Sequence, residues 1–209
     1  MNHPEKAVCI YRLGEKIVFI FQEEDASDPR EWDNLGTFWA FHKRYTLGDK
    51  QEHGDPTPSE FGGWKEFDEF LYKEKEAVIV LPVFMYDHSG ITVSTSEFRD
   101  PFDSGRLGTI WVSREKVLKE YRLKRNITAK VKEKVRAVLQ SEIQTYDDFV
   151  TGRCWYYVLE VNGEETDSCG GIYETYGKND FSYIRQCAFG DDWEKSEQVS
   201  ASDLEEDEE

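Results

Sequence analysis

The sequence predicts an α+β fold with a mixed, mainly antiparallel sheet and one long amphipathic helix packed on a face. Three observations support this fold class: two strand pairs joined by two-residue turns, a continuous apolar segment at residues 77–85, and an apolar helical stripe at residues 127–150. The chain has 209 residues, of which 38% are hydrophobic and 14% are aromatic. A chain of this length can bury a sizeable core without disulfides or structural metal ions.

The N-terminal part of the chain predicts strands and an exposed loop. Residues 7–13 and 16–22 are rich in Val, Ile, Phe and Tyr, and Gly14-Glu15 between them predicts a hairpin turn. Residues 36–45 predict a further strand. Residues 48–63 carry two prolines and four glycines, so they predict an exposed loop.

The middle of the chain predicts a short helix followed by a buried strand. The helix is indicated by apolar residues at helical spacing, namely Trp64, Phe67, Phe70 and Leu71. Residues 77–85 form an apolar run typical of a central strand. Pro82 within this run must lie at a bulge or a sheet edge, because proline cannot donate to the ladder. Short strands are predicted at residues 91–95 and 109–112, and Ser113 can cap a helix that starts at Arg114.

The C-terminal part predicts the long helix and a second hairpin. Nine apolar side chains form one stripe over residues 127–150, and the other faces of this helix are charged. Gly152 is suited to the position just after the helix end. Asn162-Gly163 lies between residues 154–161 and residues 164–172, and this dipeptide is a strong hairpin signal.

The charge of the chain is distributed unevenly. We predict one domain over residues 1–190 and a disordered tail over residues 191–209, where ten acids against one lysine give a net charge of −9. Residues 114–136 hold ten bases and three acids, a net of +7. Such a stretch can form a nucleic-acid patch, but it is more often a solvated helical face, and here it could also dock the tail. Since the whole chain carries −17, all other residues together carry −15.

Composition and cysteine usage indicate a compartment and a class of partner. The four cysteines form no CxxC pair, and no signal peptide or membrane-spanning segment is predicted, so we expect reduced thiols and a cytoplasmic location. The acidic field repels phosphate backbones and anionic membranes. We therefore expect no direct nucleic-acid or membrane binding, and a basic, nucleic-acid-binding protein as the partner.

Polar residues next to glycine in three loop segments are candidates for chemistry. Asp33, Asp87, His88 and Asp103 could converge on Mg²⁺, Mn²⁺ or Zn²⁺, or exchange a proton. The same segments are also typical of ordinary turns, in which aspartate side chains close Asx-turns and glycine takes a positive φ. On this second interpretation no cofactor is needed.

Two further acids stand out because they break a local rule. Asp147 and Asp148 lie in the last turn of the predicted long helix, where the helix dipole disfavours negative charge. Such residues are sometimes functional, although solvated surface acids are the simpler interpretation. Together with Asp100 and Asp103 they are the candidate binding residues.

Several motifs in order resemble a family of uncharacterised proteins associated with bacteriophages and other mobile elements. The motifs include REWDNLG (Arg30 to Gly36), YDHSGIT (Tyr86 to Thr92) and DPFDSG (Asp100 to Gly105), and the resemblance spans roughly residues 28–175. It implies an origin and no catalytic roles: a phage-type protein that acts inside an infected cell.

Two functions follow as hypotheses. The leading one is an acidic interaction protein that imitates nucleic acid and inhibits a host defence system (CRISPR, restriction or similar) or another nucleic-acid-binding protein, because carboxylates on a rigid scaffold can replace phosphates. The alternative is a metal-dependent hydrolase or nuclease that uses the Asp/His cluster.

Overall fold

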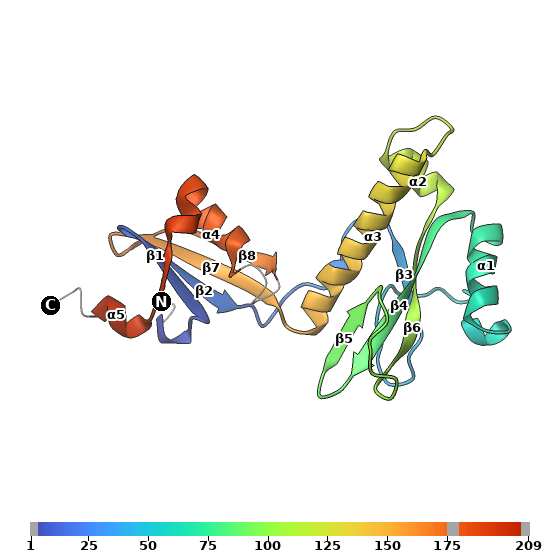
Figure 1. Ribbon diagram of the computed structural model, residues 1–209, viewed down its shortest axis with the longest axis horizontal. Coiled ribbons are helices and arrows are strands. Elements are labelled where there is room, and N and C mark those ends of the chain that lie inside the picture. Colours follow the sequence, from blue (N-terminus) through green and yellow to red (C-terminus); the bar gives the residue numbers. More distant parts are fainter. Residues whose placement is uncertain (1–3, 175–179, 206–209) are drawn as a thin grey trace. The chain divides into compact units, whose positions relative to one another are not determined.

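The structure is a computed structural model that describes residues 4–174 and 180–205 (Figure 1). The chain divides into two compact units: unit 1 comprises residues 1–27 and 148–209, and unit 2 comprises residues 28–147. This division differs from the single domain predicted over residues 1–190. It arises because strands from both ends of the chain pair in unit 1, whereas the long segment between them forms a sheet of its own.

The α+β fold class is confirmed. The described strands form two sheets in place of the one predicted, and every pair among them is antiparallel. The long helix α3 (Ala129–Val150) packs on the sheet of unit 2.

Unit 1 contains a five-stranded sheet of order β8-β7-β2-β1-β9. Its strands are β1 (Cys9–Leu13), β2 (Lys16–Gln22), β7 (Cys154–Val161), β8 (Glu164–Tyr173) and β9 (Glu197–Val199). Both predicted hairpins are confirmed, as β1–β2 and β7–β8. Asn162 and Gly163 have φ values of 55° and 78°, which is the pair of positive angles that a tight hairpin turn of this kind requires.

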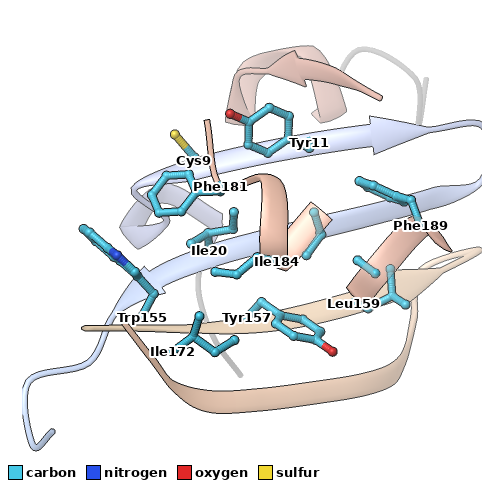
Figure 2. Packing of buried hydrophobic residues seen from close by; sticks show 12 residues of the cluster. Cys9, Tyr11, Ile20, Trp155, Tyr157, Leu159, Ile172, Phe181, Ile184 and Phe189 are labelled. Atoms are coloured by element: carbon cyan, nitrogen blue, oxygen red, sulfur yellow. The ribbon is translucent and has the colours of Figure 1, made fainter. Parts of the chain in front are cut away.

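Helices cover both faces of this sheet. Helix α4 (Ser182–Phe189) lies over one face, and its Ile184 and Phe189 pack with side chains that include Trp155 and Tyr157 of β7 (Figure 2). The other face holds Phe19, Phe21 and Val158, against which Ala201 and Leu204 of the short helix α5 (Ala201–Glu205) pack. Alternate residues of each strand therefore point into two separate apolar layers.

The segment predicted to be a disordered tail is structured over residues 191–205. The 3-10 helix η4 (Gly190–Lys195) leads into β9, which pairs antiparallel with β1. Buried Arg185 of α4 donates to the carbonyl oxygens of Trp193 and Ser196 at 3.0 and 3.1 Å, and its guanidinium stacks on the rings of Tyr11 and Trp193. Residues 206–209 of the predicted tail lie outside the described residues. Strand pairing and a buried arginine hold this segment, whose composition alone is typical of disorder.

Unit 2 contains a four-stranded sheet of order β3-β6-β4-β5. Its strands are β3 (Thr37–Ala40), β4 (Ala77–Asp87), β5 (Ile91–Ser94) and β6 (Ser104–Ser113). Pro82 is tolerated in β4 because β5 pairs only with Phe84 to Asp87, so Pro82 lies where that side of β4 has no strand beside it. The strand predicted at residues 36–45 ends at Ala40, since the chain bends back and Gly48 bridges to Trp39.

Two helices cover opposite faces of this sheet (Figure 1). Helix α1 (Trp64–Glu74) packs Phe67 and Leu71 against Trp39 and Trp111. On the other face α3 packs so closely that a Cβ on Gly36 would lie 2.6 Å from Leu139 of this helix. The helix α2 (Arg114–Glu120) follows β6 directly, and Ser113 caps it by accepting from the N–H of Lys116, as predicted.

The four cysteines differ in their exposure to solvent. Cys9 and Cys154 are buried, whereas Cys169 and Cys187 are exposed. None of the helices within residues 4–174 and 180–205 combines the length and the apolar character needed to cross a bilayer.

Truncation tests the structured C-terminal segment. Ending the chain after Gly190 removes η4, β9 and α5 and leaves buried Arg185 without its acceptors, so we expect unit 1 to lose about 2–4 kcal/mol of unfolding free energy. Ending the chain after Glu205 keeps these contacts and should change stability by less than about 0.5 kcal/mol. Urea unfolding followed by far-UV circular dichroism measures both. Equal stability of the two truncated chains would contradict the order assigned to residues 191–205.

Candidate functional site

The structure brings together part of the predicted Asp/His cluster. Asp87 is the last residue of β4 and His88 follows it, and Asp103 directly precedes β6. His88 Nδ1 lies 2.9 Å from Asp103 Oδ2, and the N–H of Asp87 donates to the carbonyl oxygen of Asp103 at 2.9 Å. Asp33 lies in a different loop, and among the described residues no hydrogen bond or ion pair joins it to the other three.

Asp87 of this cluster and the neighbouring Asp100 already have hydrogen-bond partners. Arg44 donates to Asp87, and Asp100 accepts from the N–H groups of Phe102 and Asp103 at 2.8 and 3.3 Å. The last two contacts form an Asx-turn, which is the structural interpretation of these motifs. Phe102 at the tip of this turn is 93% exposed.

A shallow hollow of about 310 Å³ adjoins the cluster and has both signs of charge in its lining. Its cations include Arg44 and Arg106, and its acids are Asp87 and Asp103. Within residues 4–174 and 180–205, no three His, Cys, Asp or Glu side chains are placed to hold a metal ion together. The contact between His88 and Asp103 could support proton exchange, but Asp87 is neutralised by Arg44.

The two acids at the end of α3 are buried, which corrects the interpretation of them as solvated surface acids. Asp147 is 6% exposed and Asp148 is 4% exposed. Asp147 accepts from the N–H of Val93 at 2.8 Å, and Asp148 accepts from Nε of Arg153 at 2.8 Å. These donors offset the unfavourable interaction of the carboxylates with the helix dipole, so each carboxylate stabilises the fold of its own unit.

A buried arginine, Arg30, links distant segments of unit 2, and no sequence pattern indicated it. The Arg30 side chain is 3% exposed and contacts Asp49 through Nε and NH2 at 2.6 and 3.0 Å. Its NH1 donates to Glu142 of α3 at 3.1 Å, and its NH2 donates to the carbonyl oxygen of Gly36 at 2.9 Å. Glu142 also accepts from the N–H groups of Leu35 and Gly36.

Charge complementarity keeps Arg30 ionised in this buried place. Burial alone would lower the pKa of Arg30, but the hydrogen bonds and negative charges of Asp49 and Glu142 outweigh it and raise the pKa above its usual value. Arg30 is the first residue of the REWDNLG motif. Its position against Asp49, apart from any cavity described above, indicates a structural role for this motif residue.

Among the described residues, the excess of exposed acids over exposed bases lies in unit 1. By sequence, unit 1 holds 22 acids and 7 bases, a net of −15, whereas unit 2 holds 21 acids and 19 bases, a net of −2. In the described part of unit 1, thirteen acids are exposed and only three bases are: Lys6, Lys16 and Lys195. The exposed acids are Glu5, Glu15, Glu24, Asp25, Glu164, Glu165, Asp167, Asp180, Asp191, Asp192, Glu194, Glu197 and Asp203.

Four of the acids of unit 1 meet where the two hairpins turn, and we call them the hairpin-end acids: Glu15, Glu160, Glu164 and Glu165. The carbonyl oxygen of Glu15 accepts from the N–H of Asn162 at 3.2 Å, which joins the two turns. Glu160 and Glu165 are direct partners across β7 and β8. Partial burial and the charge of Glu165 raise the pKa of Glu160, so this pair is electrostatically unfavourable.

Replacing the buried arginine tests the network in unit 2. Arg30→Met leaves Asp49 and Glu142 without their cation, so we expect a loss of about 3–5 kcal/mol in unfolding free energy. Arg44→Met is the matched control, because the Arg44 side chain is 69% exposed and a surface ion pair contributes about 0–1 kcal/mol. Urea denaturation measures both values. A loss in Arg30→Met no larger than in Arg44→Met would refute the role of Arg30.

The pair of facing glutamates predicts a pH-dependent effect. The pKa of Glu160 is raised by folding, so the pair destabilises the protein increasingly as the pH rises through the unfolded carboxyl pKa toward the folded one. Glu160→Gln should therefore raise stability by about 0.2–1 kcal/mol at neutral pH and leave it nearly unchanged at about pH 3, where the carboxyl of Glu160 is protonated. Glu164→Gln, which faces Val161, is the control. Thermal unfolding at the two pH values measures the difference, and an equal gain at both would rule out the electrostatic origin.

Comparison with known proteins finds no matching family model, no similar curated protein and no similar solved structure. The resemblance to a phage-type family therefore stays a prediction. The function must be argued from the geometry and charge of the described residues.

Proposed function

We propose that this chain is an acidic, phage-type interaction protein whose unit 1 imitates nucleic acid and binds the basic surface of a nucleic-acid-binding host protein. The observation that carries this proposal is the excess of thirteen exposed acids over three exposed bases in the described part of unit 1. The exposed residues of unit 2 are balanced, with twelve acids and thirteen bases, so the excess belongs to one part of the chain.

Ordered backbone holds most of these carboxylates. Glu164, Glu165 and Asp167 lie on strand β8, and Asp191 and Asp192 lie in η4, which the Arg185 contacts hold against α4. Carboxylates fixed in this way lose little conformational entropy on binding, in contrast to those of a flexible tail. A fixed array of negative charges is the property that lets a protein surface take the place of a phosphate backbone.

The hairpin-end acids support a functional origin for the acidity. An opposite charge across from Glu160 would stabilise the sheet, but Glu165 occupies that position. Charges on an edge strand such as β8 also discourage edge-to-edge association, and a lysine would serve that purpose equally well. Residues that break a local rule at a cost in stability are often kept for binding.

The partner that this surface fits is a protein whose own ligand is nucleic acid. Such proteins present Lys and Arg in a groove or on a face, and opposite charge on the inhibitor accelerates association. A nuclease or effector of a host defence system, such as restriction or CRISPR, is a partner of this class. The site of action would be the cytoplasm of the host cell.

Charge reversal at the hairpin-end acids tests the proposal. The full chain is immobilised and host lysate is passed over it at about 0.05 M and about 0.5 M salt, because screening should release an electrostatic partner. A captured protein is then purified and its affinity measured with and without competing DNA. We expect the variant Glu15→Lys, Glu164→Lys, Glu165→Lys to bind it at least about tenfold more weakly, a change of about 1.4 kcal/mol.

The control reverses three exposed acids of unit 2, Glu31→Lys, Glu74→Lys and Glu97→Lys, which changes the net charge by the same amount. This control should bind almost as well as the parent protein, and DNA should compete with both. Binding that survives reversal of the hairpin-end acids, or that ignores competing DNA, would overturn the proposed function.

A further inference from the structure

Unit 2 carries a local surface of the opposite charge, which we call the basic corner. It consists of seven exposed cations at the end of α2, in the connecting segment and in the first turns of α3: Lys119, Arg122, Lys124, Arg125, Lys130, Lys132 and Lys134. Over residues 119–134 only Glu120 and Glu133 are exposed acids. More than half of the thirteen exposed bases of unit 2 therefore lie in one short segment.

The fold holds this segment together. Arg114 at the start of α2 donates to the carbonyl oxygen of Arg125, and the N–H of Leu123 donates to the carbonyl oxygen of Leu118 at 2.8 Å. Arg114 and Lys132 line one hollow of about 510 Å³. Figure 1 shows α2 beside the N-terminal end of α3, so the cations of both helices are at the same end of unit 2.

The cations of the basic corner have no acid partner in the part of the chain that the structure describes. Among the described residues no ion pair joins any of the seven to an acid. Lys130 and Lys134 are four residues apart on α3, which places two like charges next to each other. Helix α1 differs, because its Lys73 lies 3.5 Å from Glu69 one turn earlier. The like charges of α3 would be relieved by a bound polyanion.

The chemistry of the corner favours a duplex over a single strand. Proteins that bind single-stranded nucleic acid combine basic residues with exposed aromatic rings on which bases stack. One large ring, Tyr72, is 48% exposed in the hollow lined by Arg114 and Lys132, and no large hydrophobic side chain is exposed within residues 114–136 themselves. A single ring offers no platform for successive bases, so the clustered cations are suited to the phosphate backbone of a double helix, which supplies affinity without sequence preference.

We propose that the basic corner of unit 2 binds the phosphate backbone of duplex DNA without sequence preference. The expectation that the chain avoids nucleic acid rested on its net charge of −17. That charge lies mainly in unit 1, and within a salt solution an exposed charge is screened beyond about 8–10 Å. The inference is independent of the proposed function, because it concerns different residues in a different unit.

Fluorescence anisotropy tests this inference on the full chain. The probe is a labelled DNA duplex of arbitrary sequence and about 25 base pairs, which is long enough to bind one protein. The affinity should fall steeply with salt. The variant Lys130→Glu, Lys132→Glu, Lys134→Glu should bind at least tenfold more weakly at about 50 mM salt, and its salt slope should be smaller by about three. A second variant, Lys124→Glu with Arg125→Glu in the connecting segment, should also weaken binding, and it leaves α3 unaltered.

The matched control is Lys16→Glu, Lys50→Glu, Lys65→Glu, three exposed lysines outside the corner with the same change in net charge. It should retain affinity within about threefold of the parent protein, a difference of less than 1 kcal/mol. Three results would each overturn the inference: no binding of the duplex at low salt, an equal loss in the control, or tighter binding of single-stranded DNA. Polyglutamate at the same total charge is a further competitor. If it displaced the labelled duplex as effectively as unlabelled DNA does, the inference would also be overturned.

Discussion

The buried guanidinium of Arg30 is the interaction on which the arrangement of unit 2 depends. It contacts carboxylates from two distant segments, Asp49 and Glu142, and the carbonyl oxygen of Gly36. Each of these groups would be costly to bury alone, so the cluster forms only when the three segments meet. The contact holds α3 against the loop that enters β3, and the close packing at Gly36 follows from it. This contact stabilises the scaffold that presents every other surface of unit 2, including the basic corner.

Hydrogen bonding to protein donors also distinguishes the structural acids from those that are available to a partner. Asp49, Glu142, Asp147 and Asp148 are removed from solvent to a large degree, and each accepts hydrogen bonds from backbone or arginine donors. Asp100 closes a turn in the loop before β6. The negative charge of these acids is used inside the protein. Exposed acids occur in both units, but those of unit 1 lie in a unit that exposes only three bases among its described residues.

The charge of this protein is therefore best described unit by unit. A net of −17 describes neither part well, because unit 1 carries −15 and unit 2 carries −2. Each unit also carries a local concentration of like charge at a cost in stability: Glu160 faces Glu165 across a sheet, and Lys130 adjoins Lys134 on a helix. The two proposals depend on these two surfaces separately. Together they describe a protein with one surface for a basic partner and another for a polyanion.

The sequence by itself determined the elements that depend on local patterns. The α+β class, both tight hairpins, the run of β4 and the long helix follow from the alternation or helical spacing of apolar residues, with Asn162-Gly163 and Ser113 as local signals. Only the tertiary structure decided the rest, because pairing between distant segments leaves no local trace. The pairing of β2 with β7 splits the chain into two units, and the pairing of β9 with β1 orders a segment that reads as disordered. Likewise, burial of Asp147 and Asp148 depends on donors from Val93 and Arg153, and helical periodicity alone cannot reveal whether such a donor is present.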